Sequence, residues 1–293
     1  MNKLPTETRV SILKALIEGC SLRSTSRLNG VSINTVTKLL ENAGRTCAKA
    51  MDRMMRRVPC RNLQLDEIWA FVHTKDKNLP PELVGVPGIG SVWTWVAIDA
   101  DTKLIPSYLV GLRDGDYARA FVKDLASRLK YRVQITTDGL KAYVQAMEDG
   151  FGSEVDYAVL HKIYGEARPD EARYSPAECC GIDKKPMMGS PIEGLVCTSH
   201  VERQNLTMRM GMRRFTRLTN GFSKKLANHE HAVALHFFHY NFIRRHMTLR
   251  MPPALKAGIV DHWWTMEELV ELIDRDEAEQ KRAVKQYQEK ISN

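Results

Sequence analysis

The chain has 293 residues, of which 43% are apolar and 27% charged, and its formal net charge is +8. This length can bury one large core and a small second domain, and no apolar run reaches the roughly 18 to 20 residues that a membrane span needs. The six cysteines form no C-x-x-C pair, which favours reduced thiols over a disulfide framework. Because the N-terminus also lacks the pattern of a signal peptide, we expect a soluble, cytoplasmic protein without a membrane partner.

The positive charge is concentrated in two segments. Residues 1–62 contain 12 Lys and Arg against 4 Asp and Glu, and residues 203–229 contain seven Lys and Arg and no acid. Residues 261–293, in contrast, carry nine acids and five bases. One basic run is usually a solvated face, whereas two such runs indicate a polyanion that is contacted at two places.

The first 44 residues predict a helix-turn-helix DNA-binding domain. Short helices are expected at residues 6–19, 21–30 and 31–44. Ser21 and Ser32 are suitable N-caps, and Gly44 is a suitable stop for the third helix. The residues expected to face a DNA groove are Asn34, Thr35, Thr37 and Lys38. A generic three-helix bundle is the alternative, and the local charge favours DNA binding.

Residues 45–62 are expected to form a basic linker. The arginines of this segment predicted to contact DNA are Arg53, Arg56 and Arg57.

From residue 63 the apolar pattern becomes that of strands. A strand at 63–72 is followed by two strands that form a hairpin, VWTWVAIDA and LIPSYLVGL, then by the helix DYARAFVKDLASRL and the strand YRVQITTDG. Three strands, a helix, a strand and a helix is the order of an RNase H-like α/β core with a mixed sheet. We therefore predict such a domain over residues 63–250, with an irregular insertion at 165–196 and a helical tail at 251–293.

Two aspartates of this core are expected to meet. Asp66 lies in an apolar strand, where a carboxylate is costly unless a cation or strong donors hold it. Strand alternation directs Glu67 to the opposite face. The first and fourth strands of the predicted order run side by side in parallel, which brings Asp66 near Asp138 at the carboxyl ends of the strands. Taken alone, Asp138 before Gly139 is also typical of a turn.

A third carboxylate, Glu202, lies on a predicted helix together with Asn205 and Arg209, which share its face at i+3 and i+7. Taken alone, Glu202 is typical of a surface acid. Three carboxylates would form an oxygen-rich, two-ion site for Mg²⁺ or Mn²⁺, with no organic cofactor. Asn205 and Arg209 of this helix are candidates for DNA binding, and Arg213 and Arg214, beyond the helix, are candidates for contacts with DNA phosphates.

The histidines between residues 229 and 246 suggest a zinc site as an alternative. They are His229, His231, His236, His239 and His246. Their neighbours are largely apolar, which favours a packing helix over a metal site.

Four segments carry a resemblance to a known family: LQLDEIW, ITTDGLKAY, HVERQNLTMRMGMRRFTRLTNGFSKK and HYNFIRRHMTLRMPPA. They strongly resemble bacterial insertion-sequence transposases of the DDE class, in particular the IS-one-like group, over about residues 60 to 258. The resemblance implies an RNase H-like catalytic core with Asp66, Asp138 and Glu202 as its triad, and Arg209 as the basic position after the glutamate. The family's YN-x-x-R-x-H pattern corresponds to Tyr240, Asn241, Arg244 and His246, and Arg244 is a further candidate for DNA binding.

The expected function is metal-dependent cleavage at transposon ends and strand transfer into target DNA, by a homo-oligomer in a synaptic complex at the bacterial nucleoid. Relatives often carry a cysteine-rich metal finger near the N-terminus, and this chain departs from that pattern because it shows only the helix-turn-helix. Two alternatives remain. One is an RNase H-like nuclease without strand transfer, and the other is a transposase-derived repressor that binds DNA without catalysis.

Overall fold

A computed structural model describes residues 3–165, 179–216 and 220–292. The chain divides into two compact units. One contains residues 1–55, 69–92 and 206–293, and the other contains residues 56–68 and 93–205. None of the helices in the described ranges is long and apolar enough to cross a bilayer.

A six-stranded mixed sheet forms the core of the second unit, and its strands follow the order β3-β2-β1-β4-β5-β6. The strands are β1 (Asn62–Val72), β2 (Gly90–Asp99), β3 (Ser107–Gly111), β4 (Val133–Thr137), β5 (Val155–Tyr164) and β6 (Cys179–Met188). β4 pairs in parallel with both β1 and β5, whereas β2 and β3 form an antiparallel pair. The predicted RNase H-like α/β class, with the first and fourth strands adjacent, is confirmed.

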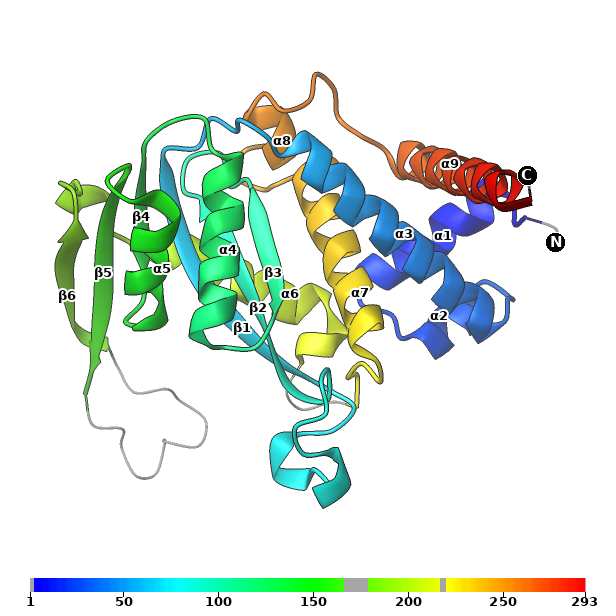
Figure 1. The fold of residues 1–293 in the computed structure, drawn as a ribbon, viewed down its shortest axis with the longest axis horizontal. Coiled ribbons are helices and arrows are strands. Elements are labelled where there is room, and N and C mark those ends of the chain that lie inside the picture. Colours follow the sequence, from blue (N-terminus) through cyan, green and yellow to red (C-terminus); the bar gives the residue numbers. More distant parts are fainter. Residues whose placement is uncertain (1–2, 166–178, 217–219, 293) are drawn as a thin grey trace. The chain divides into compact units, whose positions relative to one another are not determined.

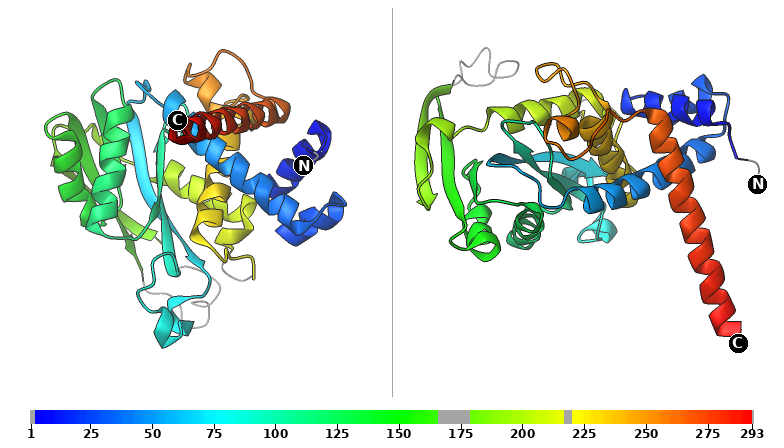
Figure 2. Two further views of the ribbon diagram at one scale, coloured as in Figure 1. Left: turned by 45° about the vertical axis from the view of Figure 1, so that its right-hand side comes forward. Right: turned by 90° about the horizontal axis from the view of Figure 1, so that it is seen from above.

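Helices cover both faces of this sheet. α4 (Gly115–Arg128) and α5 (Ala142–Phe151) lie side by side on one face (Figure 1). α4 buries Phe121 and Leu125, two residues at the predicted helical spacing, and Asp114 caps its first turn through the backbone N–H groups of Asp116 and Tyr117. The first turns of α6 (Ser199–Gly211) lie on the opposite face (Figure 2).

The irregular insertion expected at residues 165–196 contains regular structure. Residues 179–188 form β6, which pairs antiparallel with β5 over eight positions from Tyr157 to Tyr164. Irregular register explains why this strand escaped the sequence pattern, since shifts interrupt the pairing at both ends. Residues 166–178 of the predicted insertion lie outside the described part of the chain.

The N-terminal helices of the first unit are α1 (Thr6–Ile17), α2 (Leu22–Leu28) and α3 (Ile33–Met54). Ser21 and Ser32 act as the predicted N-caps, accepting hydrogen bonds from the Ser24 and Thr35 backbone N–H groups at 3.0 and 3.2 Å.

The third helix does not stop at Gly44. It continues to Met54, so most of the segment expected to be a linker is helical. Gly44 instead allows a close approach between helices, because a Cβ at this position would lie 2.4 Å from the Cα of His231 in α7 (Leu226–Phe238).

The acidic C-terminal segment packs on these helices. α9 (Met266–Ser292) contacts α1 and α3, and Asp274 and Asp276 accept hydrogen bonds at 2.5 Å from Arg9 and Lys49 respectively. Part of the N-terminal positive charge is therefore neutralised within the unit. The remaining elements are the π-helix His239–Ile243, α8 (Pro253–Lys256), and short 3-10 helices at Asp76–Asn78, Pro81–Leu83, Glu193–Leu195 and Arg213–Phe215.

Candidate active site

The register of β1 and β4 brings the two aspartates together. Leu65 of β1 pairs with Thr137 of β4, so Asp66 and Asp138 are the next residues on adjacent parallel strands. Asp138 follows the last residue of β4, and its Oδ1 accepts a hydrogen bond from the Leu140 N–H at 3.0 Å. The turn considered for Asp138 is thus present. It engages Oδ1, while Oδ2 lies 4.0 Å from the guanidinium of Arg113.

Glu67 joins this pair. Carboxylate oxygens of Asp66, Glu67 and Asp138 lie within 4.8 Å of one another. The expectation that Glu67 points away from Asp66 is wrong, because alternation sets the direction of Cβ and leaves the end of a long side chain free. The pairing of β1 with β4 ends at Leu65, so no β4 residue blocks the path of the Glu67 side chain past the strand edge.

The three carboxylates have little compensating charge. Burial, followed by the charges of neighbouring acids, raises the pKa of Glu67 to about 7 and that of Asp66 to about 6. Glu67 is 7% exposed, and hydrogen bonding from Tyr143 and Arg113 lowers the pKa of its carboxyl by less than burial and the neighbouring acids raise it. Buried carboxylates that are only partly compensated are costly, so this cluster favours a bound cation.

Arg113 is the main cation beside the cluster in the described part of the unit. Its Nε donates to Glu67 Oε2 at 3.0 Å, and its guanidinium lies 4.0 Å from Asp138 Oδ2 and 4.8 Å from the centre of the Trp93 ring. The sequence pattern did not predict that Glu67 and Arg113 belong to this site. The available signal was the position of Arg113 just after β3, at the edge of the same sheet.

The start of α6 is fixed to the strand that carries Asp66. Gln64 Oε1 accepts hydrogen bonds from the His200 and Val201 backbone N–H groups at 2.8 and 3.2 Å. One turn later, Asn205 Nδ2 donates to Asp66 Oδ2 at 2.8 Å. Asn205 was predicted to bind DNA, but it is 3% exposed, so its contact is with the acid. Gln64 and Asn205 thereby orient the helix and the Asp66 carboxylate together.

Glu202 lies on this helix but outside the cluster of oxygens within 4.8 Å. Its carboxylate is held by Lys162 of β5, whose Nζ lies 2.5 Å from both oxygens, and by the Thr198 hydroxyl at 2.6 Å. The side chain is 42% exposed. Its charge also contributes to the raised pKa of Asp66, after burial and Asp138, so the two carboxylates interact electrostatically.

The donor set fits a hard divalent cation. Asp66, Glu67 and Asp138 offer carboxylate oxygens, the ligands that Mg²⁺ and Mn²⁺ prefer, and these oxygens lie within 4.8 Å of one another. Among the described residues no other group of His, Cys, Asp and Glu is arranged to hold a metal. The histidine segment forms α7, where His229 and His236 are buried and burial lowers the pKa of each to about 3.

The other predicted DNA contacts lie elsewhere on the chain. In α3, Asn34, Lys38 and Arg53 are exposed, and Thr35 and Thr37 are half-buried. Arg56, Arg57, Arg213 and Arg244 are exposed, and Arg209 and Arg214 are half-buried. Exposed side chains of this kind are available to a polyanion without any change in the fold.

Comparison with known proteins yields structural similarities only. No protein-family model matches the chain, and no curated protein matches it. A piggyBac transposase in a synaptic complex with hairpin DNA is similar at a TM-score of 0.41 and 11% identity, covering 93% of this chain and 71% of the other. A Mos1 transposase in a pre-cleavage transpososome is similar at a TM-score of 0.21 and 13% identity, covering 54% and 60%. At this level the similarities assign no activity to this chain.

Proposed function

We propose that the protein is a DNA transposase whose RNase H-like core catalyses metal-dependent phosphoryl transfer. The observation that carries the proposal is the convergence of Asp66, Glu67 and Asp138 at the ends of β1 and β4, with oxygens within 4.8 Å and too little compensating charge. This arrangement is suited to divalent cations, which when bound would activate an oxygen nucleophile and stabilise the charge on the leaving oxygen.

Each residue has a defined task in this proposal. Asp66 and Asp138 would hold the ions, and Glu67 would supply an additional oxygen from the buried side. Asn205 keeps the Asp66 carboxylate in one orientation through its 2.8 Å hydrogen bond. Glu202 joins the site when Lys162 releases its carboxylate, which is exposed enough to move.

The reaction requires two transfers at phosphorus. In the first, a water oxygen attacks a phosphodiester at the element end, and the bond from phosphorus to the 3′ oxygen breaks. In the second, the freed 3′-OH attacks a phosphodiester of the target, and a target 3′ oxygen leaves. No side chain has to form a covalent intermediate, so Ser and Tyr residues need not act as nucleophiles.

DNA recognition in this proposal uses surfaces outside the acidic cluster. The exposed residues Asn34 and Lys38 of α3 would reach base edges. The exposed arginines Arg53, Arg57 and Arg244 would contact phosphates. Joining two ends requires two active sites, so we propose that the protein works as a homo-oligomer in the bacterial cytoplasm, at the nucleoid.

Strand transfer is tested by product analysis. Purified protein is incubated with a duplex taken from the DNA that flanks its own coding region and with a supercoiled target plasmid, in Mg²⁺, Mn²⁺ or EDTA. Wild type is expected to give joined products only with a metal, and Asp138→Ala is expected to give none. Tight binding without cleavage in any metal would contradict the transposase and favour the repressor. Cleaved but never joined ends would favour a nuclease.

A further inference from the structure

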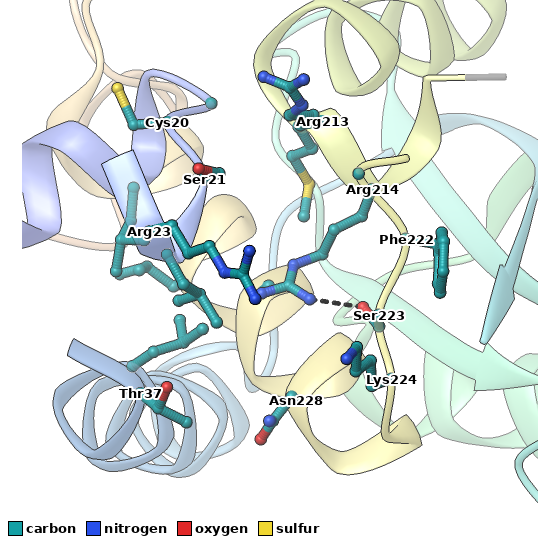
Figure 3. A pocket seen from close by; sticks show the side chains of 18 of the residues that line it. Cys20, Ser21, Arg23, Thr37, Arg213, Arg214, Phe222, Ser223, Lys224 and Asn228 are labelled. Atoms are coloured by element: carbon teal, nitrogen blue, oxygen red, sulfur yellow. Dashed lines mark hydrogen bonds between the residues drawn. The ribbon is translucent and has the colours of Figure 1, made fainter. Parts of the chain in front are cut away.

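The first unit contains a cavity of about 860 Å³ whose walls come from three separate parts of the sequence. The end of α1 and the start of α2 form one side, α3 and α7 form the back, and residues 212–214 and 220–225 close it (Figure 3). Its size is in the range of small-molecule sites. Leu16, Leu40 and Leu235 give it apolar walls.

The polar lining of this cavity is strongly cationic. Among the described residues, five Lys and Arg line it and Glu41 is the one acid. The five are Arg23, Arg213, Arg214, Lys224 and Lys225. None of them forms a salt bridge with a carboxylate of the described residues, although the same unit pairs Arg9 and Lys49 with the acids of α9. The protein therefore neutralises bases elsewhere in this unit and leaves these five for another anion.

Arg214 is the most constrained of these cations. It is half-buried, and its Nη1 donates at 2.5 Å to the hydroxyl of Ser223, which is neutral. Burial without a compensating acid lowers the pKa of its guanidinium to about 10. A guanidinium has five donors in a planar fork, and this geometry matches the oxygens of a phosphate.

Two further groups complete the cluster. Figure 3 shows the guanidinium of Arg23 on α2 directed toward that of Arg214, although like charges repel. His236 in the cavity wall is 5% exposed, and its Nε2 has no hydrogen-bond partner among the described residues. An anion between the two guanidinium groups would offset their repulsion, and the His236 ring nitrogen is a further polar group in the cavity wall.

We propose that this cavity binds a phosphate group of a nucleotide, with Arg214 and Arg23 on the phosphate oxygens and Lys224 at the entrance. The nucleotide is either free in solution or part of a DNA strand, and the chemistry of recognition is the same. The site lies entirely in the unit formed by residues 1–55, 69–92 and 206–293, so the proposal is independent of the acidic centre.

Calorimetric titration of the full chain with inorganic pyrophosphate tests the site, in EDTA and at an ionic strength held constant with NaCl. Wild type is expected to bind one pyrophosphate per chain. Arg23→Gln and Lys224→Gln are each expected to weaken binding about tenfold, the effect of one charge-assisted hydrogen bond. Arg27→Gln is the matched control, because Arg27 is an exposed arginine of the same helix that does not line the cavity, and its affinity should equal that of wild type.

Competition identifies the source of the phosphate. If pyrophosphate displaces a 20-base-pair duplex and Arg23→Gln also weakens binding of the duplex, the phosphate belongs to DNA. If dAMP binds with the same dependence on Arg23 and the duplex is not displaced, the ligand is a free nucleotide. The proposal is overturned if wild type shows no saturable binding of pyrophosphate or dAMP, if Arg23→Gln binds as wild type does, or if Arg27→Gln weakens binding equally. Because EDTA is present throughout, failure of the metal centre leaves these outcomes unchanged.

Discussion

The acidic centre and the basic cavity are charged sites of opposite sign in different units of the chain. In the former, three carboxylates lie within 4.8 Å of one another, and Arg113 is the nearest base. In the latter, five described Lys and Arg residues line a cavity, and Glu41 is the one acid among the described lining residues. The acids are partly buried, whereas most of the bases are exposed at the cavity mouth. Each site is therefore complementary to an external ion, a cation in one case and a phosphate in the other.

Because the two sites differ in burial, their charges should affect the stability of the fold to different extents. Uncompensated charge is costly in proportion to its removal from water. The acidic centre should consequently destabilise the metal-free fold, while the basic cavity should have little effect on folding and should act mainly on binding. Substitutions at each site should therefore have different effects on stability and on binding.

The largest expected effect is on catalysis. Asp66→Ala or Asp138→Ala should reduce metal-dependent DNA cleavage by at least ~1,000-fold, because each removes a ligand of the ions that stabilise the transition state. Cleavage rates of a labelled duplex measure the effect, and duplex affinity should stay near that of wild type. Asp116→Ala, at a side chain that is 86% exposed in α4, is the control and should retain full activity. Activity within tenfold of wild type would remove the altered aspartate from the centre.

The second-largest effect is expected from a substitution between α3 and α7, the helices that form the back wall of the basic cavity. Gly44→Ala should lower the free energy of unfolding by about 1–3 kcal/mol, because its methyl group would meet the α7 backbone at His231. Helix propensity alone predicts the opposite sign. Urea denaturation measures the difference. Gly115→Ala at the start of α4 has only an ordinary 3.6 Å contact and should not destabilise the protein; equal losses in both variants would contradict the assigned contact.

Removing one buried charge should stabilise the acidic unit. In EDTA, Glu67→Gln is expected to raise the free energy of unfolding by about 1–2 kcal/mol, since it relieves repulsion and the cost of a buried carboxylate. Arg23→Gln, at the exposed cavity mouth, should change it by less than ~0.5 kcal/mol. Chemical denaturation of both variants makes the comparison direct. A loss of stability in Glu67→Gln would mean that the pair with Arg113 outweighs the repulsion.

The smallest effect concerns the lysine that holds Glu202. Lys162→Met should strengthen Mn²⁺ binding by up to about fivefold, because a partly exposed ion pair worth ~0.2–1 kcal/mol no longer competes for the carboxylate. Lys185→Met is the matched control, since Lys185 pairs with Asp183 at the edge strand. Weaker Mn²⁺ binding in Lys162→Met would show that the lysine supports the centre instead of competing with it.

Local patterns were sufficient to predict the order of the core. The apolar runs and the period of two gave β1 to β4 and the hairpin, and parallel pairing of β1 with β4 then placed Asp66 beside Asp138. The caps at Ser21 and Ser32 were also predictable, because capping depends on residues three apart in the chain.

The features that the sequence did not predict depend on contacts between residues far apart in the chain. Gly44 is a typical helix stop in sequence, but packing against α7 keeps α3 helical to Met54. Glu67 enters the acidic cluster because β4 ends at Thr137, and Lys162 reaches Glu202 only because β5 lies beside β4. No pattern confined to one segment contains this information.

The most direct test of the acidic centre is a titration with Mn²⁺, followed by the loss of the electron paramagnetic resonance signal of the free ion. Wild type should bind Mn²⁺ in a form that Mg²⁺ displaces, and Asp138→Asn should lose this binding while its circular dichroism spectrum stays unchanged. Equal Mn²⁺ binding by the two proteins, or none by wild type, would contradict a metal centre at the ends of β1 and β4.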